Sequence, residues 1–440
     1  MEREVLKEEK KLNWKKIFKI MLKGIKIRLY LSDDQQLMIN KLLGSYRFIY
    51  NQCLSYKITN YETDKKNTSL SDLGHYFHQD LRNEFDWLKE HNTKVLKQSI
   101  INLERAYKNF FRGVKDRCKV GFPKYKSKHD VQKVRFPQEA IASKTFDEEN
   151  SKLNLTTIIR GLKFECSDRD KQYLYKNKSG IKSITIIKNK CGQYYATILI
   201  DGDLLRTVNE PVRESIGIDL GIKTLLTLSN GETIDNPRWI NSNEKRLKKL
   251  HKQLSKKQKG SNNRTKAKLK LAKVHEQIKN KKQDYLHNIT TKIVSENQII
   301  VLEDLNVSGM MKNHKLAKAI QELGLYEMRR QIEYKAKWYG REVIFVSRWF
   351  PSSKTCSCCG NIKHDLKLSD REYICENCGL VIDRDENAAI NIENEGIRLY
   401  EESIGQRMPE FKLVEHPTMD DKDVNPLKSS GVMKQENVLT

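Results

Sequence analysis

Four cysteines in two closely spaced pairs form the most chemically specific pattern in this sequence. The pairs are Cys356 with Cys359 and Cys375 with Cys378, and fifteen residues separate the inner two. Thiolates at this spacing suit a tetrahedral divalent ion about 2.3 Å from each sulfur, and the pattern is typical of a zinc ribbon. Cys358 is another candidate ligand in the first group of cysteines, but only Cys356 and Cys359 have the same spacing as the second pair. We therefore expect one structural Zn²⁺.

Acidic residues follow the second cysteine pair, in the segment 383–386 (Asp-Arg-Asp-Glu). A helix that starts here has Asp383 as its N-cap and Glu386, three residues on, as the second member of a capping box. Asp385 shares its side of that helix with three apolar residues and is predicted to face inward: Ala388, Ala389 and Ile392. The alternative is that Asp385 only stabilises the helix dipole, which contributes roughly 0.3–1 kcal/mol.

Two further carboxylates lie toward the ends of predicted strands. Asp219 is late in an alternating strand, with glycines on either side that leave room for a metal ion or a phosphate. Glu303 ends an apolar run, as expected of a central strand that brings a ligand to the edge of a sheet. Asp219 alone is ambiguous, because RNase H/RuvC-like nucleases and actin/Hsp70-like ATPases both have an acidic first strand.

Asp219, Glu303 and Asp385 fall on an early strand, a central strand and a C-terminal helix, which is the distribution that an RNase H-like site needs. Clustered carboxylates repel one another unless cations lie between them. Two Mg²⁺ would neutralise the cluster, activate a water and stabilise the leaving oxygen of a phosphodiester. The predicted chemistry is therefore phosphodiester hydrolysis.

Basic charge is concentrated in two windows of this 440-residue chain, whose formal net charge is +25. Residues 105–135 hold eleven Lys/Arg against two acids, and residues 244–282 hold sixteen against two. One-signed charge at this density favours a polyanion, and nucleic acid is the expected one. In the first window lysines alternate with aromatics, which suits phosphate contacts and base stacking, and the candidates are Lys124, Tyr125 and Lys126. The alternative is a solvated loop with ordinary core aromatics.

Membrane and secreted classes are disfavoured. No apolar run approaches the roughly 18 residues of a membrane-spanning helix, and the first residues are charged, unlike a secretory signal. The nine cysteines are scattered and odd in number, which fits a reducing cytosol better than a disulfide framework.

Apolar periodicity indicates how the chain is organised. A strand at 23–30 and later strands form one β module, and helices over 32–120 are an insertion in it. The later strands are expected at 153–158, 181–188 and 193–200, and the inserted helices include 70–90 and 93–114. The remaining chain is predicted to contain three strands over 214–234, a lysine-rich helical hairpin over 243–296, a buried strand over 298–306, a helix over 315–340, a strand before the cysteines and a final helix over 385–404.

Five segments, in this order and spacing, resemble the TnpB (OrfB) family, the RNA-guided DNA endonucleases that bacterial insertion sequences encode and that are related to type V CRISPR effectors. The segments are SIGIDLGIKTLLTLSNG, IIVLEDLNVSGM, SSKTCSCCG, REYICENCG and DRDENAAINI. GIKIRLYLSDDQ, RFIYN and GFPKYKSK add to the resemblance, which covers about residues 21–415. The combination is specific, although each motif alone is weaker.

The resemblance implies an α/β multidomain fold. One part is an RNase H/RuvC-like nuclease domain with an inserted four-cysteine zinc ribbon, and the other is a wedge-type β-barrel interrupted by a helical recognition lobe. The implied boundaries are 1–20 for an N-terminal extension, 21–31 and 126–212 for the barrel, 32–125 for the lobe, 213–350 and 383–408 for the nuclease, 351–382 for the ribbon and 409–440 for a disordered tail.

The resemblance also implies a function: an RNA-guided endonuclease that cuts DNA by two-metal catalysis next to a short adjacent motif. Its partners would be a guide RNA from the end of the element and double-stranded target DNA, in the bacterial cytoplasm at the nucleoid. Asp219, Glu303 and Asp385 would be catalytic and would hold two Mg²⁺, and the four paired cysteines would hold one Zn²⁺. Residues implied to contact nucleic acid are Ser353 and Arg384, with Lys94 and Gln98 in the lobe for the adjacent motif.

Two alternatives belong to other functional classes. A nuclease-inactive RNA-guided repressor, or a transposition accessory factor, would hold nucleic acid without cutting it, but the intact carboxylate set argues against this. An actin-like ATPase needs phosphate-binding glycines in its later strands, where this sequence has the cysteine pairs. The oligomeric state is not predicted.

Overall fold

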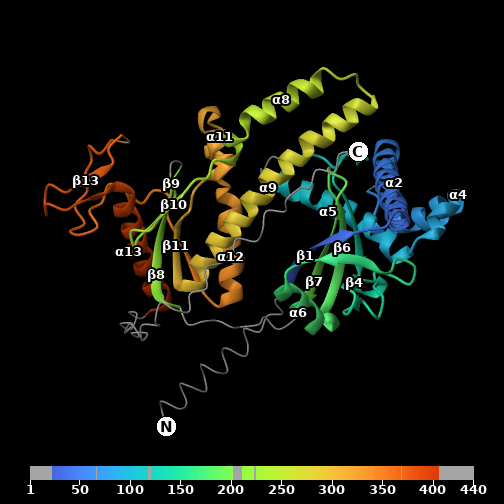
Figure 1. Cartoon of the computed structure of the whole chain (residues 1–440), viewed down its shortest axis with the longest axis horizontal. Helices are drawn as coiled ribbons and strands as arrows, with labels where there is room; N and C mark the ends of the chain where they lie inside the picture. Colours follow the sequence, from blue (N-terminus) through green and yellow to red (C-terminus); the bar gives the residue numbers. More distant parts are fainter. Residues whose placement is uncertain are drawn as a thin grey trace, which may run out of the picture. The chain divides into compact units, whose positions relative to one another are not determined.

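The computed structural model of the chain describes residues 22–65, 67–116, 120–201, 211–221, 224–367 and 369–405 (Figure 1). It divides into two compact units, of which unit 1 comprises residues 1–207 and 238–285 and unit 2 comprises residues 208–237 and 286–440. The expected N-terminal extension (1–20) and disordered tail (409–440) lie outside the described residues. Within the described ranges, no helix has both the length and the apolar character needed to cross a membrane.

Unit 1 is built on one antiparallel sheet of seven strands, in the order β2-β6-β7-β1-β5-β4-β3. The first and last strands of this sheet along the chain, β1 and β7, pair from Leu22 opposite Asp201 to Leu29 opposite Tyr194. The edge strands β2 and β3 do not pair with each other in the described residues, so no closed barrel forms there. The strands are β1 (Leu22–Tyr30), β2 (Gln132–Pro137), β3 (Phe146–Asp147), β4 (Lys152–Leu153), β5 (Leu162–Glu165), β6 (Ile181–Lys188) and β7 (Tyr194–Asp201).

One of the predicted strands of this sheet is wrong. Of residues 153–158, only Leu153 is in a strand, and the strands β2, β3 and β5 were not expected. Local hydrogen bonds explain the difference, because the Thr156 hydroxyl accepts from the backbone N–H groups of Ile158 and Ile159, and Asn154 Oδ1 accepts from Gly161 N. Short polar side chains that bond to nearby backbone turn the chain out of a strand.

The helices between β1 and β2 contain the predicted insertion, with one correction. The helix expected over 70–90 breaks at Phe85, whose ring packs 4.9 Å from that of Phe48, and the part before Phe85 changes from α-helical to π-helical geometry over Tyr76–Leu81. The helices are α2 (Asp33–Asp64), α3 (Leu70–His75), η1 (Tyr76–Leu81), α4 (Arg82–Glu84), η2 (Asp86–Glu90) and α5 (Thr93–Lys115), and after β2 come η3 (Gln138–Ala140), α6 (Asp168–Lys176) and η4 (Lys178–Gly180).

A basic helical hairpin forms where the lysine-rich pattern predicted it. It follows α7 (Trp239–Ser242) and consists of α8 (Glu244–Ser255) and α9 (Asn262–Glu296), whose last residues belong to unit 2. The Arg264 guanidinium closes the turn by donating to the backbone oxygens of Leu254 and Lys257. The break therefore falls near residue 260, as expected from Gly260 and the polar residues after it.

Unit 2 contains a five-stranded mixed sheet in the order β10-β9-β8-β11-β12. Strand β9 is antiparallel to both of its neighbours, β10 and β8, and β8, β11 and β12 are parallel to one another. The strands are β8 (Arg213–Leu220), β9 (Thr224–Leu228), β10 (Thr233–Asp235), β11 (Asn297–Glu303) and β12 (Glu342–Val346). The helix expected over 315–340 is interrupted at Gly324, whose φ is +72°, so the connection from β11 to β12 is α10 (Val307–Met310), α11 (His314–Leu323) and α12 (Leu325–Tyr339).

The cysteine-containing segment is inserted between β12 and the last helix of unit 2. It contains a small hairpin of β13 (Glu372–Ile374) and β14 (Val381–Asp383), and a bridge that joins Thr355 to Ile362. The helix α13 (Arg384–Ile404) follows directly, and Figure 1 shows it alongside β8 with β13 near its start. The hairpin is therefore followed directly by the first turn of α13.

Candidate active site

Helix α13 lies directly against β8 because a glycine lets the two backbones approach. A Cβ placed on Gly217 would be 2.1 Å from the backbone oxygen of Ala389, so no larger residue fits without moving the helix. One turn further along α13, Glu393 accepts a short hydrogen bond from the Ser215 hydroxyl. Because Ala389 is level with Gly217 and Glu393 with Ser215, the helix runs antiparallel to the strand.

This docking brings the three predicted carboxylates toward one end of the sheet. Asp219 lies two residues beyond Gly217 on β8, and Asp385 lies one turn before Ala389 on α13. Glu303 is the last residue of β11, the parallel neighbour of β8. The pKa of Asp219 is raised to about 7 by burial and then by the negative charges of Glu303 and Asp385. Side chains distant in the sequence therefore act on one another electrostatically.

A serine that the sequence did not single out orients Glu303. The hydroxyl of Ser352, which is buried, donates to Glu303 Oε1 at 2.7 Å. Asn391 of α13 in turn donates to the backbone oxygen of Ser352 at 2.8 Å. Burial raises the pKa of Glu303, and the Ser352 hydrogen bond partly offsets this. The predicted neighbour, Ser353, is partly buried in the same loop.

Asp385 is held in the first turn of α13. Asp383 is the N-cap, as predicted, and its carboxylate accepts from the backbone N–H groups of Asp385 and Glu386. The Arg384 guanidinium donates to Asp385 Oδ1 at 2.8 Å, and Arg371 Nη1 lies 3.9 Å from Asp385 Oδ2. Arg384, predicted to contact nucleic acid, thus pairs with a carboxylate of the cluster.

Asp304 has the opposite environment from its neighbour Glu303. Its two oxygens accept from Arg329 at 2.7 Å and from Arg348 at 2.6 Å. Hydrogen bonds from these two arginines lower the pKa of Asp304. The strand end therefore has one carboxylate, Asp304, paired with two arginines, beside another, Glu303, whose pKa is raised by burial.

The four predicted cysteines form a compact cluster with the geometry of a single metal site. Their sulfurs all lie within 4.8 Å of one another, and the Cys356–Cys378 and Cys359–Cys375 Sγ distances are both 3.6 Å. Four sulfurs each about 2.3 Å from a tetrahedral ion are roughly 3.8 Å apart. Cys358 is exposed and lies outside the cluster. Asn377 donates to Cys359 Sγ and lowers the pKa of that thiol to about 6, which favours the ligating thiolate.

The three carboxylates are not packed as tightly as the sulfurs. In the described ranges, the cysteine cluster is the only group of three or more acidic, histidine or cysteine side chains whose ligand atoms all lie within 4.8 Å of one another. Ligands that share two cations need not all surround one point. Desolvation and then two neighbouring carboxylates raise the pKa of the partly buried Asp219, and added cations would relieve the repulsion among these charges.

The other predicted nucleic-acid contacts lie in unit 1. Lys94 is exposed at the start of α5, and Gln98, one turn later, is partly buried. Lys124 and Tyr125 are exposed. Lys126 differs, because its ammonium lies 3.6 Å from the centroid of the Tyr50 ring, and burial lowers its pKa to about 8.

A large basic cavity in unit 1 was not predicted from the sequence. Its volume is about 970 Å³, and it lies among β1, β6, the residues before β2 and the first half of α9. Seven lysines line it, with two acidic side chains: Lys26, Lys128, Lys133, Lys188, Lys190, Lys268 and Lys279, with Asp130 and Glu276. Some of the lysines that line the cavity belong to the two basic windows of the sequence, but the lysines of β1 and β6 lie outside both windows.

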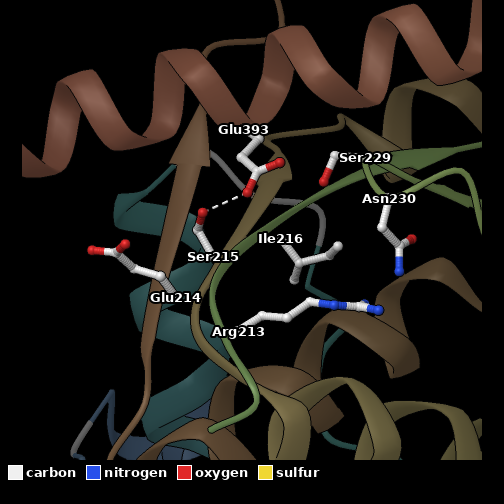
Figure 2. Close-up of a pocket in the computed structure, with 7 residues that line it drawn as sticks. All are labelled: Arg213, Glu214, Ser215, Ile216, Ser229, Asn230 and Glu393. Carbon is white, nitrogen blue, oxygen red and sulfur yellow. Dashed lines mark hydrogen bonds between the residues drawn. The ribbon is translucent and has the colours of Figure 1, made fainter. Parts of the chain in front are cut away.

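A smaller pocket of about 310 Å³ opens at the beginning of β8 in unit 2 (Figure 2). Figure 2 shows Glu393 reaching from α13 toward Ser215, while Glu214 points to the other side of the strand. Ser215 is four residues, or roughly 13 Å, from Asp219 along the strand. The pocket is therefore distinct from the carboxylate cluster and contains none of its three members.

Three family descriptions match successive parts of the chain. Residues 201–314 match the OrfB_IS605 family ("Probable transposase"), residues 326–392 a "Cas12f1-like, TNB domain", and residues 21–66 a "Helix-turn-helix domain". A "Putative RNA-guided DNA endonuclease" of Streptomyces pristinaespiralis is 34% identical over 378 residues, which cover 85% of this chain and 89% of the relative. The chain belongs to the TnpB (OrfB) family.

A further relative agrees with this membership, and a solved structure has a similar fold. InsQ of Escherichia coli K12, which has the same descriptive name, is 30% identical over 388 residues, covering 84% of this chain and 91% of InsQ. The structure of a Cas12f1–sgRNA–target DNA complex matches with a TM-score of 0.50 at 15% identity, covering 84% of this chain and 98% of that one. The structural match shows a Cas12f-like α/β fold for this TnpB-family chain.

Proposed function

We propose that this TnpB-family protein is an RNA-guided, Mg²⁺-dependent DNA endonuclease that cuts next to a short adjacent motif. The observation that carries the proposal is the close packing of α13 on β8, next to β11, which brings Asp219, Glu303 and Asp385 to one end of the sheet; burial and then the two neighbouring carboxylates raise the pKa of Asp219 there. The names of the relatives support guide RNA and DNA as partners. The strand order of unit 2 supports an RNase H/RuvC-like nuclease domain. The sheet of unit 1, which does not close in the described residues, supports a wedge-type β module interrupted by a helical lobe.

In this proposal Asp219, Glu303 and Asp385 hold two Mg²⁺. When bound, the ions would activate a water and stabilise the charge on the leaving oxygen of the phosphodiester. Ser352 keeps the Glu303 carboxylate in one orientation, and Arg384 does the same for Asp385. Asp219 is only partly exposed to solvent, which reduces competition from bulk water. The residues of the chain thus supply a preorganised set of oxygen ligands.

The most direct test of this function is programmed cleavage. The full chain is purified with the RNA that accompanies it, the RNA is sequenced, and a plasmid with the matching target beside a randomised flank is added with Mg²⁺. We expect linear plasmid and enrichment of one flanking sequence among the cut molecules. Target binding without cleavage would instead support the repressor alternative.

We also propose that the cysteine cluster holds one structural Zn²⁺. Cys375→Ala should lose about one zinc per chain and destabilise unit 2, because metal binding to such a site contributes on the order of 10 kcal/mol to folding. Cys358→Ala is the matched control and should keep the metal, since Cys358 lies outside the cluster. Elemental analysis and the unfolding temperature measure both effects. Equal zinc in the two variants would contradict the assignment.

The basic cavity of unit 1 is proposed to bind the guide RNA backbone. The exposed Lys190, Lys268 and Lys279 are replaced by Gln, and the RNA association constant K is measured against salt concentration. The slope of log K against log salt should become less negative by about 2, since each phosphate contact to a single strand contributes roughly 0.7 to it. The control replaces three exposed lysines outside the cavity, Lys312, Lys337 and Lys367. Filter binding of the co-purified RNA across a salt series gives the slopes. Identical slopes for both triple variants would exclude the cavity.

A further inference from the structure

One exposed tryptophan lies in the loop that joins β12 to the cysteine-containing segment. Trp349 has 86% of its surface exposed, although a side chain of this size is ordinarily mostly buried. In the described residues, Trp87, Trp239 and Trp338 each pack against another aromatic ring. No such partner is found there for Trp349.

The backbone on both sides of Trp349 is fixed. Trp349 N donates to Ser347 Oγ, Phe350 N donates to the Ser347 backbone oxygen, and Ser352 N donates to the Phe350 backbone oxygen. The Phe350 ring packs on the apolar cluster beneath β11, β12 and α13. The indole is therefore presented to solvent by a rigid loop, so that little conformational entropy is lost when a ligand stacks on it.

The loop is tied to the carboxylate end of β11 on both sides of the tryptophan. Arg348, which precedes Trp349, donates to Asp304, and Ser352, three residues after it, donates to Glu303. Three residues of chain span at most about 10 Å. The exposed ring therefore stands next to the proposed catalytic cluster.

We propose that Trp349 is a stacking platform that holds an unpaired base of the bound nucleic acid beside the carboxylate cluster. The ring suits any base, because every base has a π face, and stacking of this kind contributes about 1–3 kcal/mol per base. A base in a duplex is already stacked on both faces and is not available to the indole. This inference rests on the proposed nuclease function and adds a residue that positions the substrate at its site.

The test uses the full chain with its co-purified RNA and three forms of residue 349: the parent, Trp349→Phe and Trp349→Ala. Tryptophan fluorescence is followed while a single-stranded thymidine 20-mer or a duplex 20-mer is added without Mg²⁺. The difference between parent and Trp349→Phe isolates the signal of residue 349. We expect this signal to be quenched by the single strand and much less by the duplex, and Trp349→Ala to bind the single strand about 5- to 100-fold more weakly, with Trp349→Phe near the parent.

Cleavage of a single-stranded substrate with Mg²⁺ then gives a second readout. Trp349→Ala should raise KM more than it lowers kcat, with unchanged zinc content and unfolding temperature. Equal quenching by duplex, or a Trp349→Ala variant that binds and cleaves like the parent, would overturn the proposal. A change in oligomeric state on substitution would also overturn it, because the ring would then be a protein contact. If the single strand quenches the fluorescence of the parent protein but the parent never cleaves DNA, the nuclease function alone would be refuted.

Discussion

Asp219→Asn is expected to reduce target cleavage by at least about 10³-fold while RNA co-purification, zinc content and folding are preserved. The amide has nearly the shape of the carboxylate but cannot supply the negative charge that two cations require. Since burial and two neighbouring carboxylates already raise the pKa of Asp219, removing its charge also relieves repulsion in the metal-free protein. The variant should therefore unfold at the same temperature as the parent or higher, whereas its cleavage is lost.

A matched carboxylate on α13 provides the control for this experiment. Glu393 lies two turns beyond Asp385 and accepts a hydrogen bond from Ser215, which a glutamine side chain can also accept. Glu393→Gln should cleave within about threefold of the parent. Plasmid cleavage rates at saturating Mg²⁺ compare the variants. An Asp219→Asn enzyme as active as Glu393→Gln would remove Asp219 from the catalytic set.

Gly217→Ala is expected to damage both stability and cleavage, although residue 217 has no side chain that could take part in chemistry. Its new Cβ would lie 2.1 Å from the backbone oxygen of Ala389 and 2.7 Å from the backbone nitrogen of Glu393. Both atoms belong to a helix backbone, so α13 must move away from β8. Overpacking of this kind costs about 1–3 kcal/mol, and displacing Asp385 by roughly 1 Å is expected to slow cleavage about 10²-fold.

Gly44→Ala is the control for a glycine without such a contact. Gly44 is inside α2, and a Cβ there would meet no atom within 4 Å. It should leave cleavage unchanged and raise stability by about 0.5–1 kcal/mol, because alanine loses less backbone entropy in a helix. Thermal unfolding and plasmid cleavage of both variants give the comparison. A Gly217→Ala protein with parental activity would mean that the position of α13 does not determine the site.

The sequence predicted the structure best where the chemistry or the spacing of the residues allows few arrangements. The cysteine spacing predicted the cluster, including the exclusion of Cys358, because tetrahedral thiolate ligation leaves little freedom. The apolar stripe beyond Asp385 predicted that α13 packs inward, and Ala388, Ala389 and Ile392 are indeed buried. Alternating strands with a glycine turn predicted β8, β9 and β10. These features are local, so periodicity is sufficient to find them.

The parts that the sequence did not reveal depend on contacts between distant residues. Ser352 rather than Ser353 bonds to Glu303, and this choice is made by the turn after β12 and by Asn391 of α13. The break at Gly324 and the turn at Thr156 are decided by single backbone positions inside otherwise periodic stretches. Lys126, predicted to face nucleic acid, lies over the Tyr50 ring, a partner more than seventy residues earlier. Local patterning carries no information about such pairings.

The measurement that tests the account most directly is the location of Mn²⁺ by anomalous X-ray scattering from crystals of the protein bound to its RNA. The account predicts manganese peaks within coordination distance of the carboxylate oxygens of Asp219, Glu303 and Asp385, and their loss in Asp219→Asn. Peaks elsewhere, with these three carboxylates free of metal at saturating Mn²⁺, would contradict it.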